Sequence, residues 1–125
     1  IFEVTGTVLL NFDRYEEALD YFRKAYAKDE DGWYLYSIGR CLRGLGRYEE
    51  AIEVLLQSRR ISEQEGDVTD GEDVELVRCY IGLKDKKNAE KYLELAREGA
   101  DNVADDFIDE YEEELDQLED MIDEL

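Results

Sequence analysis

Two stretches of the sequence spell nearly the same helix start: DRYEEALDYF at residues 13–22 and GRYEEAIEVLL at residues 46–56. They share the run Arg-Tyr-Glu-Glu-Ala, and Ala18 in the first stretch lies 33 positions before Ala51 in the second. Self-similarity at a period of roughly 20 to 50 residues is typical of proteins built from stacked structural repeats. The pair therefore predicts a repeat architecture.

Apolar residues at helical spacing surround the repeated stretch. One stripe at i, i+3, i+7 and i+10 runs through residues 35–45, and a second stripe follows in residues 51–61. Gly44 and Gly46 stand on either side of the last residue of the first stripe, where glycine can end a helix and turn the chain sharply. Residues 32–62 therefore predict an αα-hairpin, that is, a helix, a tight turn and a second helix.

The same pattern extends to both sides of this hairpin. Residues 1–28 predict a first hairpin, and residues 72–99 predict a third. Ala89 follows Ala51 by 38 positions rather than 33, so the second helix of the middle hairpin, the loop after it, or both are longer. The acidic residues 66–75 in this connection lack the spacing of an EF-hand calcium loop, and they predict a solvated loop.

The three units resemble tetratricopeptide repeats, whose pattern is W-x2-L-G-x2-Y followed by A-x3-F and a proline. The middle and first units fit best, whereas the third has aspartate for the large apolar residue and valine for the glycine. The terminal proline is missing from all three units. The matching positions are Leu35, Ile38, Gly39, Leu42, Ala51 and Leu55 in the middle unit, Phe2, Thr5, Gly6, Leu9, Ala18 and Phe22 in the first, and Asp73, Leu76, Val77, Tyr80, Ala89 and Leu93 in the third.

The resemblance covers roughly residues 1–100 and implies a fold. It implies an all-α, right-handed α-solenoid of three helix-turn-helix hairpins, to which the sequence adds a C-terminal helix that caps the stack or associates with another chain. A single hairpin cannot bury its apolar face alone, and about three stacked units are needed for stability. The expected boundaries are 1–31, 32–69 and 70–101 for the repeats and 102–125 for the acidic helix.

The charge of the chain is strongly negative and unevenly placed. The net charge is −20, and residues 101–125 carry 13 acidic residues and no basic one. Such a field repels nucleic acid and anionic membranes, so neither is an expected partner. Like charges at i, i+4 also oppose the C-terminal helix, and only packing of its apolar stripe can offset them. We expect Phe107 to Leu118 to pack on hairpin three or on a partner chain, with weaker order beyond.

The sequence also bears on the setting of the chain. It opens at Ile1 rather than at methionine, so we expect a segment of a longer protein, with any targeting signal outside it. Its apolar runs are too short to span a bilayer. Two cysteines do not make a disulfide scaffold, which favours a reducing, cytoplasmic location.

Residues with the chemistry of catalysis are scarce. The chain has no histidine that could activate a nucleophile, and its carboxylates are expected on solvated helix faces. Cys41 and Cys79 do not form a metal-ligand cluster. They lie 38 positions apart, in equivalent places of successive first helices, which favours a packing role over a redox pair. We expect no enzyme activity, no cofactor and no metal.

The resemblance implies that the first helices of the hairpins line a concave groove in which peptides bind. Three arginines and two aromatic residues beside the apolar stripes would make such a groove positively charged on an otherwise acidic chain. A second interpretation, in which the arginines only pair with neighbouring glutamates, stays open. The candidate partner-binding residues are Trp33, Tyr36, Arg40, Arg43, Val74, Arg78 and Ile81.

These observations predict a non-catalytic protein–protein interaction module. It would bind a peptide or a partner helix in the groove, and an acidic segment is the expected ligand. A second hypothesis gives the chain a structural role, in which it self-associates as a homodimer through the acidic C-terminal helix. Both hypotheses exclude nucleic acid and membrane as primary partners.

Overall fold

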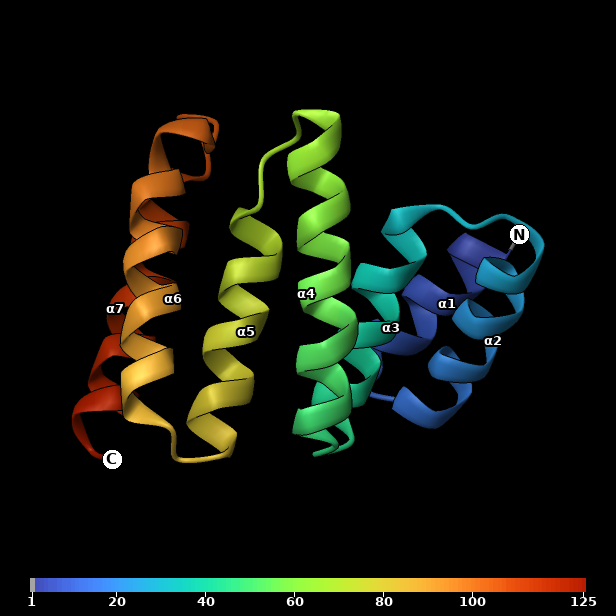
Figure 1. The fold of residues 1–125 in the computed structure, drawn as a ribbon, viewed down its shortest axis with the longest axis horizontal. Helices are drawn as coiled ribbons and strands as arrows, with labels where there is room; N and C mark the ends of the chain where they lie inside the picture. Colours follow the sequence, from blue (N-terminus) through green and yellow to red (C-terminus); the bar gives the residue numbers. More distant parts are fainter. Residues whose placement is uncertain (1) are drawn as a thin grey trace. The chain divides into compact units, whose positions relative to one another are not determined.

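The computed structural model describes residues 2–125, with side chains from residue 6 onward, and these residues form helices and no strand. They fall into two compact units, residues 1–61 and 62–125, and each unit is described by itself (Figure 1). The elements in chain order are α1 (Phe2–Asn11), α2 (Tyr15–Lys28), α3 (Gly32–Gly44), α4 (Tyr48–Glu65), α5 (Asp70–Gly82), α6 (Lys86–Glu98), the 3-10 helix η1 (Gly99–Asn102) and α7 (Ile108–Asp123).

The helices form three successive hairpins followed by one further helix. Hairpin one consists of α1 and α2, hairpin two of α3 and α4, and hairpin three of α5 and α6. In unit 1, α2 also packs against α3, and in unit 2, α7 packs against both α6 and α5. The predicted all-α, helical-repeat fold class is confirmed.

The three hairpin turns share one backbone geometry. Each turn has one residue with a positive φ, namely Asp13 at 58°, Gly46 at 77° and Lys84 at 58°. In each turn the following amide N–H donates to the carbonyl five residues earlier, as from Arg47 to Leu42 at 2.9 Å, which closes the helix in a Schellman motif. These three positions are spaced by 33 and 38 residues, so the turns repeat with the same intervals as the helices.

Small residues let the paired helices of unit 1 approach closely. A Cβ atom added to Gly39 would lie 2.5 Å from Leu55 Cδ2, and one added to Gly6 would lie 2.5 Å from Phe22 Cζ. Ala51 is completely buried. A larger side chain at either glycine would have to displace its neighbour, because protein interiors are close-packed. The predicted repeat register therefore matches the packing within these two hairpins.

The C-terminal helix α7 packs within the chain further than the sequence predicted. Its residues Leu115, Leu118 and Ile122 are buried, so the packed stripe continues past Leu118. The expected start of packing at Phe107 is wrong within this chain, because its ring is 60% exposed. The packed stretch begins instead at the first turn of α7, where the Tyr111 hydroxyl donates to the carbonyl oxygen of Ala96 at 2.7 Å.

The predicted solvated loop at residues 66–75 is also wrong in its second half. The helix α4 continues to Glu65 and α5 begins at Asp70, so only four residues separate the two helices. Within α5, the acidic residues Glu72, Asp73 and Glu75 are 8%, 2% and 6% exposed. A local sequence rich in acidic residues and glycine gave no sign that three carboxylates would be buried.

Candidate partner-binding surfaces on the first helices

The aromatic anchor of α3 is held in place at the start of the helix. Asp31 is the N-cap, and its carboxylate accepts a hydrogen bond from the backbone N–H of Trp33 at 3.0 Å. The indole packs edge-on against Phe22 at 5.6 Å and against Tyr34 at 5.5 Å between ring centroids. Trp33 nevertheless stays 43% exposed. A fixed aromatic ring with a solvent-facing side is suited to contact a partner.

One turn further along α3, an arginine lies beside an aromatic ring. The Arg40 guanidinium carbon is 5.8 Å from the centroid of the Tyr36 ring, within the range of a cation–π interaction. Arg43 follows one turn later and reaches Tyr15 of α2. The hydrogen bond that Tyr15 donates to Asp13 raises the pKa of the Tyr15 phenol, and Arg43 acts against that shift.

Three arginines of unit 1 lie near the buried thiol of Cys41. Burial raises the pKa of Cys41 to about 12, so the thiol stays protonated at neutral pH. Three arginines act against this shift, Arg40 and Arg43 of α3 and Arg23 of α2, because each lies within electrostatic reach of the sulfur. Cys41 and Cys79 are both free and buried, as packing residues would be. The guanidinium groups of these three arginines thus lie near one buried thiol.

The equivalent surface of α5 in unit 2 is different. Arg78 forms ion pairs with Glu114 of α7 and, at 3.5 Å, with Glu75 of its own helix. Val74 is buried at 7% exposure, and Ile81 is half-buried. At Arg78 the structure therefore agrees with the second interpretation, in which an arginine pairs with neighbouring glutamates.

The seven candidate residues thus divide into two groups. Trp33, Tyr36, Arg40 and Arg43 lie together on α3 of unit 1, whereas Val74, Arg78 and Ile81 lie on α5 of unit 2. One groove that joins both groups stays a prediction. Sequence reasoning missed Glu114 because it lies 36 positions after Arg78 on a helix outside the repeat pattern. Its position on the apolar-striped α7 was the only available signal.

The comparisons with known proteins agree with this architecture of repeated helical hairpins. Two models of the tetratricopeptide repeat family match the chain, one over residues 6–64 and the other over residues 74–96, about two thirds of the sequence together. The chain belongs to the tetratricopeptide repeat family. No match was found among curated proteins or among solved structures.

Family membership limits the kind of activity to consider. Tetratricopeptide repeats generally act as protein–protein interaction modules and are typically non-catalytic. Among the side chains described from residue 6 onward, no three of cysteine, aspartate or glutamate come together in a way that could hold a metal ion. None of the helices in that part of the chain has the length and apolar character needed to cross a membrane.

Proposed function

We propose that the chain is a non-catalytic interaction module that binds a peptide or a helix of another protein over the surface of α3. The observation that carries this proposal is the combination of a fixed, 43% exposed Trp33 with the arginines around Cys41. Tryptophan and arginine are the residue types that most often dominate the binding energy of protein interfaces. Their presence on one helix of an otherwise acidic chain is the support for this site.

An acidic segment with an aromatic or apolar residue fits this surface best. Carboxylates of the ligand would pair with Arg40 and Arg43, and Arg23 of the neighbouring helix adds to the local positive potential. The aromatic residue would stack on Trp33. The net charge of −20 slows the approach of an anionic ligand, so rising salt has two opposing effects on binding, and we expect a weak net salt dependence.

The residues of α5 have a smaller part in this proposal. Arg78 already pairs with Glu114 and Glu75, so a ligand carboxylate would have to replace one of these partners. We therefore propose that Arg78 adds less to affinity than Arg40, and that the half-buried Ile81 adds apolar contact whereas the buried Val74 adds little.

The single tryptophan of the chain provides a direct test. Trp33 fluorescence can follow titration with a capped peptide probe, Asp-Glu-Phe-Asp-Glu, which contains no tryptophan. We expect a saturable change in Trp33 emission, and a loss of affinity of about tenfold in the double variant Arg40→Ala, Arg43→Ala, as for lost charged contacts.

A matched control keeps the test specific. The double variant Arg14→Ala, Lys28→Ala removes the same number of positive charges from the ends of α2 and should leave the affinity within about twofold. The probe Lys-Lys-Phe-Lys-Lys should bind more weakly than the acidic probe. Equal loss in both double variants, or preference for the basic probe at Trp33, would contradict the proposed site.

The hypothesis of self-association through α7 has less support. If α7 formed a dimer interface, its apolar stripe would have to be exposed. Leu115, Leu118 and Ile122 of that stripe are instead buried within the chain itself. A structural role of that kind would require α7 to leave α5 and α6. Light scattering at rising concentration measures this directly, and the interaction-module proposal expects a constant molar mass.

A further inference from the structure

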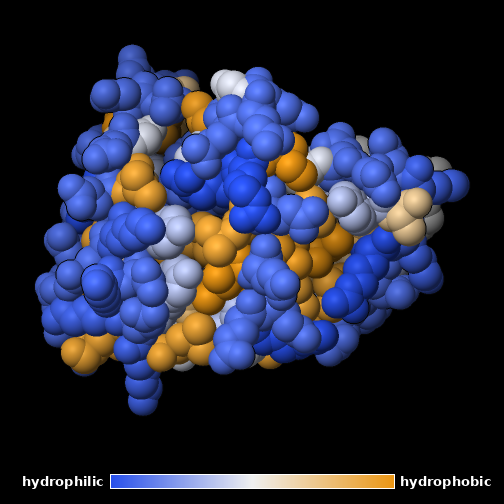
Figure 2. All heavy atoms as spheres, in the orientation of Figure 1, coloured by the Kyte–Doolittle hydropathy of each residue, from blue (hydrophilic) through white to orange (hydrophobic). Residues whose placement is uncertain are grey.

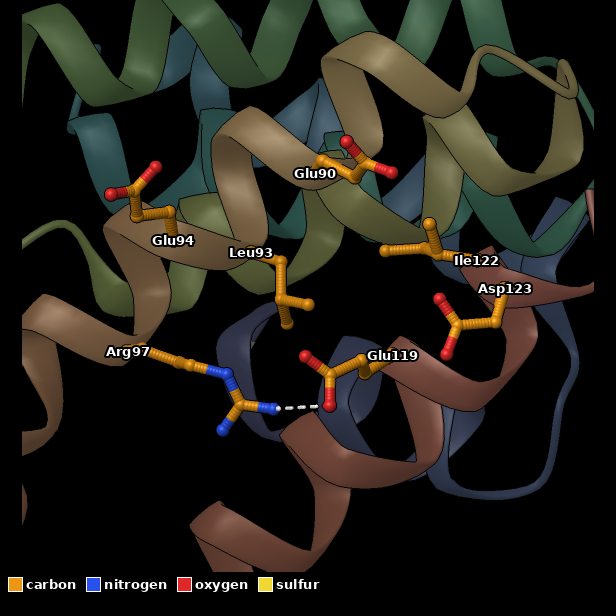
Figure 3. Close-up of a pocket in the computed structure, with 7 residues that line it drawn as sticks. All are labelled: Glu90, Leu93, Glu94, Arg97, Glu119, Ile122 and Asp123. Carbon is orange, nitrogen blue, oxygen red and sulfur yellow. Dashed lines mark ion pairs between the residues drawn. The ribbon is translucent and has the colours of Figure 1, made fainter.

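A pocket of about 310 Å³ lies between α6 and α7 in unit 2, and none of the seven candidate residues lines it. Leu93 of α6 and Ile122 of α7 lie at its centre and are 5% and 1% exposed (Figure 3). The rest of the lining is charged and mostly acidic. The charged residues are Glu90, Glu94, Arg97, Glu119 and Asp123.

The acidic residues of this pocket are not all balanced by positive charge. Arg97 pairs with Asp116 at 3.0 Å and with Glu119 at 3.5 Å, so among the lining carboxylates it balances the charge of Glu119. Glu90 and Asp123 have no ion pair or hydrogen bond with any side chain in the described part of the chain. Both are solvent-exposed. The pocket therefore keeps a net negative charge beside an apolar floor.

Figure 3 shows that the carboxylates that line the pocket point in different directions. Ile122 lies between Glu90 of α6 and Asp123 of α7 in this view, whereas the carboxylate of Glu94 points away from the centre of the group. On the visible face of unit 2, hydrophilic side chains cover most of the surface (Figure 2). Glu90 and Asp123 are thus the two carboxylates placed to meet a group that enters over Leu93 and Ile122.

The repeat register indicates that the acidity of α6 is particular to this hairpin. Glu90 and Glu94 lie 38 positions after Ile52 and Leu56 of α4, both of which are half-buried. Hairpin two therefore has an apolar helix face where hairpin three has carboxylates. At these positions α6 has two exposed glutamates, and both line the pocket.

We propose that this pocket binds a lysine or arginine side chain of a partner protein. The aliphatic stem would lie over Leu93 and Ile122, and the cationic head would pair with Glu90 and Asp123. Charge complementarity supports this occupant, because an acidic side chain would meet unbalanced carboxylates of the same sign. The net charge of −20 also favours the approach of a basic segment over long range.

A nuclear magnetic resonance titration of the ¹⁵N-labelled chain tests the proposal. The probe is the capped pentapeptide Ala-Lys-Leu-Lys-Ala, and the matched probe has norleucine in place of both lysines, which keeps the stem and removes the charge. We expect saturable amide shifts that centre on Glu90, Leu93 and residues 119–123. The norleucine probe should produce no saturable shifts there. Shifts of equal size with both probes would overturn the role of the cation.

Variants that each neutralise two carboxylates locate the site. Glu90→Gln with Asp123→Asn should weaken binding of the lysine probe about fivefold, as expected for two solvent-exposed charged contacts. Glu98→Gln with Asp109→Asn removes the same charges from the same two helices outside the pocket and should change the affinity by less than about twofold. Far-UV circular dichroism confirms that both variants keep their helices.

Two outcomes would overturn the proposal. Equal weakening in both double variants would mean that the probe binds the acidic surface without a site. If spermidine produced the same shifts with the same dependence on Glu90 and Asp123, the pocket would be a site for a free polyamine rather than for a protein side chain.

Discussion

Hairpins two and three place different side chains at equivalent positions, 38 residues apart. The helix α3 buries Tyr34 and Leu35 where α5 buries Glu72 and Asp73. Unit 2 also has α7, whose Leu115 is 1% exposed and which packs on α5 and α6. One hairpin of a repeat protein can thus keep its register with fewer apolar residues when another helix adds buried apolar surface.

The seam, that is, the contact between the two helices of one hairpin, also differs between hairpins two and three. Gly39 of α3 faces Leu55 of α4, and the equivalent position of α5 holds Val77, which is fully buried. Hairpin two therefore depends on the absence of a side chain, whereas hairpin three accommodates a branched one. The two seams should respond very differently to an added side chain.

The largest effect is expected from Gly39→Leu. Because a Cβ atom at Gly39 already lies 2.5 Å from Leu55 Cδ2, the leucine must displace a completely buried neighbour. We expect the free energy of unfolding to fall by about 3 kcal/mol, at the upper end for overpacked cores. Urea denaturation measures the change.

The equivalent change in hairpin three provides the control. Val77→Leu adds one methylene at a position that already holds a side chain, and it should cost about 1 kcal/mol. In addition, Leu55→Ala should restore part of the stability of Gly39→Leu, since the two residues share one contact. Equal losses for Gly39→Leu and Val77→Leu would mean that the proposed difference between the seams is wrong.

The sequence predicted those features of the chain that depend on local patterns. Apolar spacing predicted the helices, and Gly39 and Ala51 marked the close seam of hairpin two. The sequence also predicted that Trp33 and Arg40 lie on one helix, and their role in binding a partner stays a prediction. Contacts between distant segments were not predictable, because no local pattern pairs Arg78 with a residue 36 positions away.

The buried acidic residues of α5 are the clearest failure of local reasoning. Glu72 and Asp73 follow glycine and other acidic residues, a composition typical of loops. Their burial is a result of tertiary packing, which overrides local preference when a helix is enclosed by its neighbours. The Oε2 atom of Glu72 has no hydrogen-bond partner among the described residues. Such an arrangement costs free energy and should be measurable.

Glu72→Gln is expected to raise the free energy of unfolding, by less than Gly39→Leu lowers it. Burial raises the pKa of Glu72, the carboxylates of Asp73 and Asp70 raise it further, and a hydrogen bond from Ser62 acts against the shift. The native state then holds this proton more tightly than the unfolded chain does. Stability should therefore fall as pH rises from about 4.3, the unfolded value, through the raised folded value. The neutral glutamine avoids this loss, and we expect a gain of about 1 kcal/mol at neutral pH.

Urea denaturation from about pH 4 to about pH 8 separates this carboxylate from the rest of the acidic chain. Glu72→Gln should reduce the decrease in stability with pH, whereas the control Glu98→Gln, at an exposed position of α6, should leave the pH profile unchanged. Parallel pH profiles for Glu72→Gln and the original chain would show that Glu72 does not contribute.

The smallest effect concerns the turns, where hairpins two and three again differ at one position. Gly46 and Lys84 both have a positive φ, at 77° and 58°, but only glycine adopts this conformation without a steric cost. Lys84→Gly removes that cost of about 1 kcal/mol, and the greater freedom of glycine in the unfolded chain offsets part of the gain. We expect a net stabilisation of about 0.5 kcal/mol, measured as a higher midpoint in thermal unfolding.

Gly46→Ala should lower the midpoint, because it introduces the strain that Lys84 already carries. Asp13→Gly in hairpin one should yield less than Lys84→Gly, since aspartate tolerates this conformation better and Asp13 also accepts a hydrogen bond from Tyr15 at 2.9 Å. A lower midpoint for Lys84→Gly would show that the lysine side chain contributes more to the turn than its backbone conformation costs.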